Sequence, residues 1–206
     1  MKSNKNIYLI LLLSTLSFES LSAINQRLFG ITGHYSLMSS YYSIESAAIE
    51  KKDKTSYSNG IGGGLFFDYK YSPYASVKTH FAFFPHWKKE DSVMQYDVDE
   101  IMIEAGILSL TLFNSAPYNF WVGYGPAFQY STSDGLKNYI VSFYVASGCN
   151  YFIKHGLYLV PEVYLGANMY LKNKEYENMV KNVTETTDFL NNGFTISIKL
   201  GIAYAI

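Results

Sequence analysis

The final segment of the chain, residues 194–206, alternates between apolar side chains and small or polar ones. Its apolar positions are Phe194, Ile196, Ile198, Leu200, Ile202, Tyr204 and Ile206, and Thr195, Ser197, Lys199, Gly201, Ala203 and Ala205 lie between them. A period of two is that of a β-strand, whose successive side chains point to opposite faces. The segment is longer than the roughly 5–6 residues of an ordinary strand and meets the roughly 9–11 that a bilayer crossing needs. It predicts a membrane-crossing strand with one apolar face.

The same alternation recurs upstream. The segments that show it are residues 29–37, 61–71, 76–83, 101–113, 118–130, 141–151 and 157–169. Residues 108–113 are apolar on both faces, which leaves the register of the fourth strand open. Pro126 and Pro161 each remove a backbone donor, so we interpret them as bulges or as margins of the paired region. Together with the final segment, the pattern predicts eight strands.

The connections between these segments alternate between long and short. Residues 39–59, 86–95 and 172–192 are long, residues 131–138 are intermediate, and residues 72–73, 114–117 and 153–156 are short. An even-stranded outer-membrane barrel places both termini and its short turns on the periplasmic side. The sequence therefore predicts an all-β fold: an eight-stranded antiparallel up-and-down transmembrane β-barrel with short periplasmic turns and long extracellular loops.

Aromatic residues gather where such a barrel would meet the two membrane interfaces. Tyr71, Tyr74, Phe113, Tyr118, Tyr151 and Phe152 lie near the short turns, and Tyr96, Tyr130, Tyr139 and Tyr170 lie near the long loops. Aromatic side chains favour the headgroup region of a bilayer. The pattern predicts two aromatic belts.

The first residues have the layout of a secretory signal peptide. Lys2 and Lys5 form a basic start, residues 7–13 are apolar, and residues 20–23 offer small side chains for cleavage. The apolar run is shorter than the roughly 20 residues of a spanning helix, and no later run reaches that length. We expect a signal peptide over residues 1–23 and an outer-membrane barrel domain over residues 24–206.

Composition narrows the function classes. The chain has 206 residues, which suits one domain, and its 16 Lys and Arg nearly balance its 17 Asp and Glu. Such a balance provides no field for a polyanion, so we expect no nucleic-acid partner. Cys149 is the single cysteine and cannot form an internal disulfide. We interpret it as a small apolar strand residue.

The layout of strands, turns and apolar final strand over residues 28–206 resembles the small OmpA/OmpX-type eight-stranded outer-membrane barrels. The resemblance implies a Gram-negative outer-membrane location, contact with outer-membrane lipid and lipopolysaccharide, and insertion by the barrel-assembly machinery. It also implies a structural or surface-recognition role, in which extracellular loops bind a host or surface ligand.

If the apolar rows face lipid, the alternate polar positions project into the lumen. They are His34, Ser36, Asp68, Lys70, Lys78, His80, Glu104, Gln129, Glu162 and Lys199. Eight strands leave an interior that side chains fill, so we expect these groups to pair into a polar core. We therefore expect no wide solute pore, and a narrow porin-like ion path stays open as an alternative.

A second alternative is a lipid A-modifying barrel enzyme. His34 and Ser36 share one strand face, and Glu104 or Glu162 could orient the histidine. Because the pair would face inward, away from lipid, we favour satisfied lumen residues and expect no catalytic site. His34, His80, His86 and His155 are too scattered for zinc, and we expect no metal and no cofactor. A third alternative, a soluble lipocalin-type barrel, would turn the apolar rows inward.

Overall fold

The computed structural model describes residues 26–46, 49–90, 93–94, 100–115, 118–133, 136–171 and 192–206, and the proposed signal peptide lies outside them. The strands are β1 (Gln26–Ser46), β2 (Ile49–Ser72), β3 (Ala75–Glu90), β4 (Val93–Met94), β5 (Glu100–Ser115), β6 (Tyr118–Ser133), β7 (Leu136–Lys154), β8 (Leu157–Leu171) and β9 (Asn192–Ala205). Among the described residues, none forms a helix long and apolar enough to cross a membrane.

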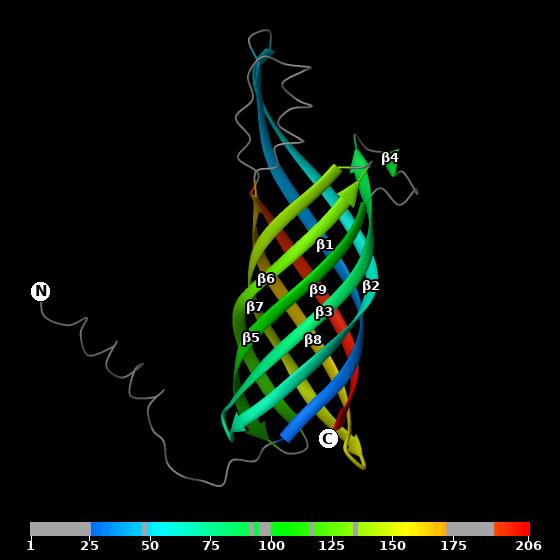
Figure 1. Ribbon diagram of the computed structural model, residues 1–206, viewed down its shortest axis with the longest axis vertical. Helices are drawn as coiled ribbons and strands as arrows, with labels where there is room; N and C mark the ends of the chain where they lie inside the picture. The colour runs from blue at the N-terminus through cyan, green and yellow to red at the C-terminus, as the bar shows by residue number, and fades with distance from the viewer. Residues whose placement is uncertain are drawn as a thin grey trace, which may run out of the picture.

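The strands form a closed antiparallel barrel (Figure 1). Consecutive barrel strands pair with each other, and β1 pairs with β9 from Leu28↔Ala205 to Tyr41↔Asn192. Of the nine strands in the sheet, the two-residue β4 pairs with β3 and does not enter the wall, which leaves eight barrel strands. The predicted pairing of first and final strands is confirmed, and closure satisfies the backbone edges that lipid cannot.

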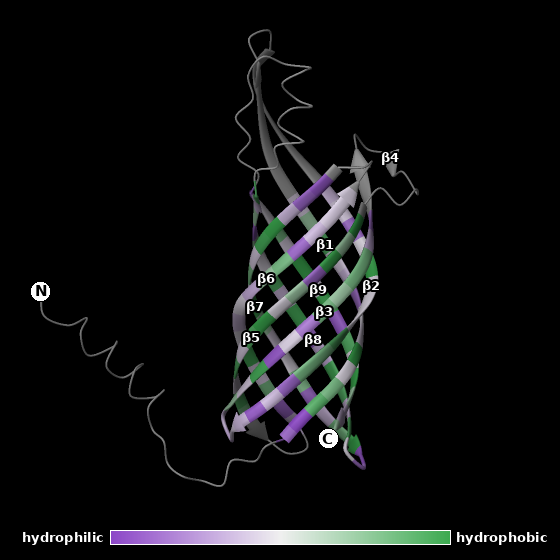
Figure 2. Ribbon diagram, viewed as in Figure 1, coloured by the Kyte–Doolittle hydropathy of each residue, from purple (hydrophilic) through white to green (hydrophobic). Residues whose placement is uncertain are grey.

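The apolar rows face outward, as predicted. On β9, Ile198 and Leu200 are 58% and 57% exposed, whereas Lys199 between them is 5% exposed. Figure 2 shows hydrophobic residues recurring along the strands of the wall. An outer face of this kind suits a bilayer and would be unfavourable in water. The lipocalin-type alternative, which needs these rows inside, is therefore wrong.

Both described chain ends and the tight turns lie at one end of the barrel, which we call the terminal end. Pro73 and Tyr74 join β2 to β3, and His155 and Gly156 join β7 to β8. His155 and Gly156 have φ of 48° and 81°. Positive φ at both central residues is the geometry of a type I′ hairpin turn, which glycine adopts without strain. The predicted parity of termini and short turns is confirmed.

The predicted long loop over residues 39–59 is instead largely paired strand. The β1–β2 ladder continues to Ile44↔Lys52 and, after a register shift, to Ser46↔Ile49. At the loop end, opposite the terminal end, these two strands extend past their neighbours (Figure 1). Apolar alternation is absent from this part of the sequence, while its Ser, Thr and Tyr residues still favour extended backbone.

Two other connections are also shorter than predicted. Residues 86–90 belong to β3, and β4 then pairs back onto them through Lys89↔Met94 and Glu90↔Val93. Strand β6 runs to Ser133 and β7 begins at Leu136. The remaining long connection falls on residues 172–191, which lie outside the described residues.

The interpretation of Pro126 and Pro161 as bulges or margins is wrong. Both lie in mid-strand on the outward face, and each stays paired with one neighbour, through Pro126↔Phe143 and Pro161↔Leu200. On the other side, the β5–β6 ladder passes from Gly106↔Ala127 to Ser109↔Tyr124, and the β7–β8 ladder passes from Gly148↔Glu162 to Tyr151↔Leu159. The register is unchanged across both gaps. A missing N–H thus interrupts one ladder locally, and the two-sided pairing of the wall tolerates the interruption.

The predicted aromatic belt at the terminal end is present on the outer face. Tyr71, Tyr74, Phe113, Tyr118, Tyr151 and Phe152 are all exposed there. The rings of Tyr118 and Tyr151 stack at 5.2 Å between centroids. At the loop end, Tyr139 is exposed, but Tyr170 turns inward, where its hydroxyl lies 3.8 Å from Met38 Sδ. Tyr170 therefore belongs to the lumen and not to the belt. Tyr96 lies outside the described residues.

Candidate functional site in the barrel lumen

The lumen is filled at several levels by apolar side chains, so it is not the purely polar core that the sequence predicts. One cluster contains Leu108, Leu110, Leu112, Trp121, Ala127, Tyr144, Ala146 and Tyr164. A second cluster joins Leu28, Phe66, Tyr158, Val160 and Ala203, and a third joins Met38, Ala82, Phe84, Met102 and Ile140. The inward leucines also fix the register of β5, which the sequence left open. The barrel is narrow enough for side chains to meet across it.

Glu104 on β5 is the centre of the polar groups in the lumen. Its Oε1 lies 2.9 Å from His80 Nε2 and 3.3 Å from Lys199 Nζ. Its Oε2 accepts hydrogen bonds from the Tyr144 hydroxyl at 2.6 Å and from Gln129 Nε2 at 2.7 Å. These five side chains come from five strands, and we call them the Glu104 network. A buried carboxylate needs such a set of donors because no water stabilises its charge.

A second ion pair joins Lys78 on β3 to Glu162 on β8. The Tyr164 hydroxyl donates to Glu162 Oε2 at 3.1 Å. Lys78 Nζ lies 3.9 Å from the centroid of the Phe66 ring and 5.2 Å from that of Trp121. An ammonium over an aromatic face gains cation–π attraction, most strongly when it is desolvated. Lys78 and Lys199, which the sequence placed in the lumen, therefore each form an ion pair with a buried glutamate.

The histidine and serine of the enzyme alternative do not form a catalytic arrangement. Ser36 Oγ lies 3.2 Å from Nε2 of His86, and Ser58 Oγ lies 3.0 Å from Nδ1 of the same histidine. His86 was not among the lumen residues expected from the sequence. Neither ring nitrogen of His34 has a hydrogen-bond partner among the described residues. Its ring packs edge-on against Phe84, with centroids 4.7 Å apart. Ser36 is thus satisfied, as expected, whereas His34 is not.

The acids proposed to orient His34 are also engaged elsewhere. Glu104 contacts His80, and Glu162 contacts Lys78. The structure therefore brings together Ser36 with His86, and Glu104 with His80, but leaves His34 apart from both carboxylates. Ser36, His86 and Glu104 are each no more than 2% exposed, so lipid outside the wall does not reach them.

Large inward rings lie opposite glycines on the neighbouring strand. The pairs are Gly30↔Phe66, Gly60↔His86, His80↔Gly106, Trp121↔Gly148 and Tyr144↔Gly166. A Cβ at any of these glycines would collide with the facing ring. The lumen residues expected from the sequence were only polar and charged groups, so Trp121, Tyr144 and Tyr164 were left out although they alternate with the apolar rows. Their position between outward residues on one strand was the available signal.

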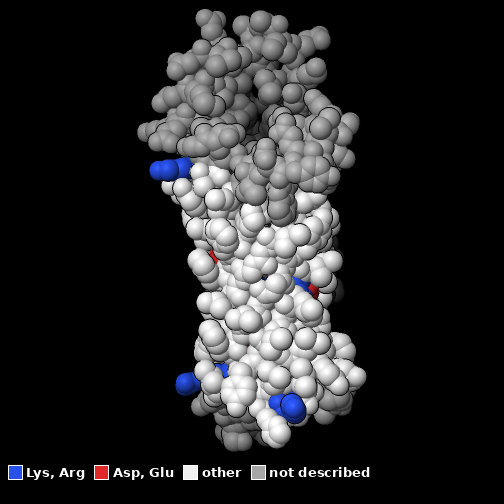
Figure 3. Space-filling view, turned by 90° about the vertical axis from the view of Figure 1, so that its right-hand side faces the viewer, with Lys and Arg blue, Asp and Glu red and all other residues white. Residues whose placement is uncertain are grey.

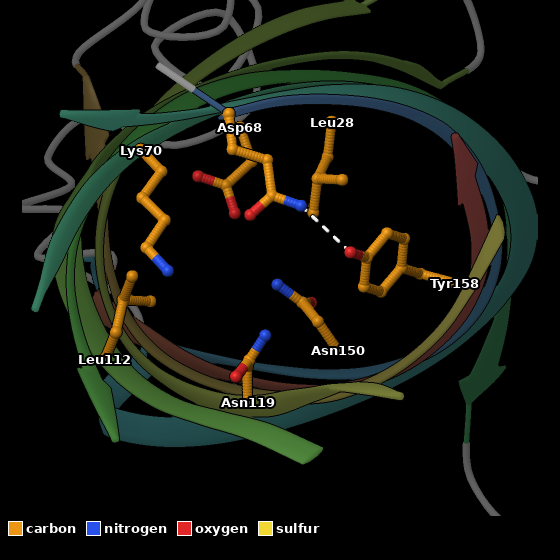
Figure 4. Close-up of a pocket in the computed structure, with 8 residues that line it drawn as sticks. Leu28, Asp68, Lys70, Leu112, Asn119, Asn150 and Tyr158 are labelled. Atoms are coloured by element: carbon orange, nitrogen blue, oxygen red, sulfur yellow. Dashed lines mark hydrogen bonds between the residues drawn. The ribbon is translucent and has the colours of Figure 1, made fainter. Parts of the chain in front are cut away.

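The terminal end of the lumen holds a pocket, which we call the mouth pocket. It is lined by Gln26, Leu28, Asp68, Lys70, Leu112, Asn119, Asn150 and Tyr158, as Figure 4 shows. Its cavity volume is about 10 Å³, which is the space of about one water molecule. Gln26 Nε2 donates to the Tyr158 hydroxyl at 2.9 Å across it. Asp68 is 5% exposed, and its Oδ1 has no hydrogen-bond partner among the described residues.

Charge is distributed differently on the two faces of the wall. Asp68, Glu104 and Glu162, the acids whose side chains the structure describes, are all buried in the lumen. Arg27 and Lys154 are exposed at the terminal end, and Lys137 is exposed toward the loop end. Figure 3 shows the blue cations near the ends of the described wall and little charge between them. A low-charge zone between charged ends is the profile of a bilayer-spanning surface.

The described residues contain no group of three or more His, Cys, Asp or Glu placed to hold a metal ion. Cys149 is a free, partly exposed strand residue.

The closed wall, apolar outer face and filled lumen define a transmembrane β-barrel of the bacterial outer-membrane type. No family model matches the chain, and no curated protein matches it either. Among solved structures, the outer membrane protein OprG from Pseudomonas aeruginosa is similar with a TM-score of 0.53 and 10% identity, covering 89% of this chain and 97% of that one. The predicted fold of the small OmpA/OmpX-type barrels is confirmed.

Two further structures share the general shape at lower similarity. The attachment invasion locus protein Ail of Yersinia pestis has a TM-score of 0.43 and 10% identity, covering 85% of this chain and 98% of that chain. Neisserial surface protein A has a TM-score of 0.43 and 11% identity, covering 84% of this chain and 96% of that chain. At such identities the likeness concerns the fold and not the activity.

Proposed function

We propose that this protein is a non-enzymatic outer-membrane scaffold that presents extracellular segments for surface recognition. The observation that carries the proposal is the filled lumen: apolar clusters and two buried ion-paired groups occupy its interior, so the barrel is suited to hold segments and not to pass solutes. At the loop end, the β1–β2 ladder continues past the wall, which offers a paired backbone support for contacts with a ligand.

Two steps of maturation belong to this proposal. Residues 1–23 would be removed as a signal peptide, and residues 24–206 would be inserted by the barrel-assembly machinery. In the membrane, the outer wall would contact phospholipid on one side and lipopolysaccharide on the other. The exposed apolar residues and the aromatic belt at the terminal end support such contacts.

A surface-binding assay tests the recognition role. Cells that display the intact barrel would be compared with cells whose hairpin is shortened by removing residues 43–53, on wells coated with heparin, laminin or lipopolysaccharide. We expect the intact chain to retain cells on at least one coating and the shortened chain to lose that retention. Heat-dependent migration on a gel would verify that both barrels are folded. Equal retention by both chains on every coating would contradict a recognition role for the hairpin.

Lipid and conductance measurements test the two alternatives. In planar bilayers, we expect no conductance steps, because the filled lumen leaves no continuous water column. Steps that disappear in a lumen variant would instead support a narrow porin-like channel. Mass spectrometry of lipid A should show the same acylation pattern with the native chain and with Ser36→Ala. A pattern that depends on Ser36 would support the enzyme.

A further inference from the structure

We propose that the outer rim of the terminal end binds the headgroups of anionic phospholipids, through the cations of Arg27 and Lys154 and the hydroxyls of Tyr71 and Tyr204. We call these four residues the terminal rim. The inference rests on the membrane contacts given under the proposed function, in which phospholipid surrounds one end of the barrel. It goes further because it names the charge of that lipid and the side chains that hold it.

Charge at the terminal end is of one sign outside the lumen. The described segments at this end are residues 26–29, 69–76, 113–115, 118–119, 150–158 and 203–206. They contain three cations, Arg27, Lys70 and Lys154, and no Asp or Glu. On the face that Figure 3 shows, blue side chains and no red ones lie at this end. Lys70 is directed into the lumen (Figure 4), so Arg27 and Lys154 are the cations left for the outer face. Such a surface attracts anions.

Arg27 lies among tyrosines of the aromatic belt. Its side chain is exposed and forms no ion pair or hydrogen bond with the described residues. Tyr69 is opposite Arg27 in the β1–β2 ladder, and the exposed Tyr71 lies two residues further along β2. Diagonal neighbours across a ladder are within reach of long and aromatic side chains. A guanidinium binds phosphate through two parallel N–H donors, and a phenol can add a third donor. Arg27 therefore has the chemistry of a phosphate-binding group.

Lys154 continues the rim on the other side of β9. Tyr204 on β9 pairs with Leu157 on β8, and Leu157 pairs with Lys154 across the β7–β8 turn. The Tyr204 ring lies against Gly156 of that turn, so it stands between the two cations along the rim. Three strand steps of about 4.8 Å separate β1 from β7, so the backbones of Arg27 and Lys154 are about 14 Å apart around the wall. We therefore expect each cation to bind a headgroup of its own.

The surroundings of the rim favour a lipid over a soluble anion. Phe29 follows Arg27 on the outer face of β1, and Ile202 precedes Tyr204 on the outer face of β9. Both apolar side chains are exposed and begin the outward rows that run along the wall. A lipid bound by its headgroup at the rim would lay its acyl chains against these rows, whereas a free phosphate has nothing to contact there.

The charge of the terminal end also favours an anionic lipid over a zwitterionic one. A zwitterionic headgroup carries an ammonium group beside its phosphate. The described terminal segments offer no Asp or Glu to pair with that ammonium. Each basic residue near a membrane surface strengthens the attraction to anionic lipid about fivefold. The rim should therefore prefer a headgroup whose charge is only negative.

Native mass spectrometry of the folded barrel tests the preference. The barrel in detergent micelles would receive equal amounts of phosphatidylglycerol and phosphatidylcholine with identical acyl chains, and the lipids that remain bound would be counted. We expect the native chain to retain phosphatidylglycerol about fivefold more often than phosphatidylcholine, and added salt to weaken the difference. Arg27→Gln should lose one bound phosphatidylglycerol. Arg27→Gln combined with Lys154→Gln should bring the ratio of the two lipids to about one.

Lys70→Gln is the matched control. It removes the same charge from the same end of the barrel, but from the lumen side, and should leave the ratio unchanged. A competition with soluble glycerol phosphate separates a lipid from a free anion. We expect no displacement, because the soluble headgroup lacks the acyl chains that contact the wall. Displacement would assign the rim to a soluble phosphate and would overturn the lipid.

Two further outcomes would show that the inference is wrong, provided that all variants migrate as folded barrels. The first is equal retention of the two lipids by the native chain. The second is an equal loss in Lys70→Gln and Arg27→Gln, which would reduce the preference to an effect of net charge without a site. Either outcome would leave the scaffold proposal intact, because retention on coated wells and bilayer conductance test the scaffold independently.

Discussion

Buried carboxylates in the middle of the lumen and at its terminal end differ in how many hydrogen-bond and charge partners they have. In the middle, both carboxylate oxygens of Glu104 have partners, and Lys199 is one of them. At the terminal end, Asp68 is almost equally buried, but its Oδ1 has no described partner. The difference indicates that the charge in the middle joins more strands than the charge at the mouth does.

The largest effect should follow from breaking the Glu104 network. Glu104→Gln removes the charge that compensates Lys199 and should lower the free energy of unfolding by about 3–5 kcal/mol, since one buried cation then lacks its partner. Urea unfolding in micelles, followed by tryptophan fluorescence, measures the change, and Trp121 lies in the lumen near this network.

A double variant serves as the control for that prediction. Glu104→Gln combined with Lys199→Met removes both charges and should recover part of the lost free energy, because no unpaired charge remains. A loss below about 1 kcal/mol in the single variant would contradict the view that the network joins the strands.

A smaller effect should follow from removing one neutral donor from Glu104. Tyr144→Phe deletes the hydroxyl that donates to Oε2 at 2.6 Å and should cost about 1.5–3 kcal/mol, the range for hydrogen bonds to charged groups. Tyr118→Phe is the matched control on the outer face, where the ring stacks on Tyr151, and should stay within about 0.5 kcal/mol. The same urea titration compares the two, and equal losses would show that the inward hydroxyl has no special role.

The strand faces could be predicted from the sequence because lipid imposes a strict alternation. The final segment fixed which residues of β9 point inward, and the same parity placed His34, Asp68, Lys78 and Glu104 in the lumen. Where lipid imposes no pattern, as in the hairpin of β1 and β2 at the loop end, the sequence read as a loop although the backbone is paired. Propensity alone does not distinguish these two states.

The partners within the lumen could not be predicted in the same way. Whether Glu104 meets His80 or His34 depends on the stagger of strands around the barrel, which alternation does not specify. One signal was present but unused. Each inward ring of Trp121 and Tyr144 lies opposite a glycine on the next strand, so glycines at inward positions of the sequence mark where large lumen side chains lie.

The smallest effect on stability should come from the buried charge at the mouth, Asp68. Asp68→Asn should change the free energy of unfolding by less than about 1 kcal/mol, and any change should be stabilising. The reason is that it removes a buried charge whose Oδ1 has no described partner, while the amide keeps the same shape. Urea titration beside Glu104→Gln gives the comparison directly. A loss as large as that of Glu104→Gln would mean that Asp68 is held by the fold itself, and the mouth would then resemble the middle of the barrel.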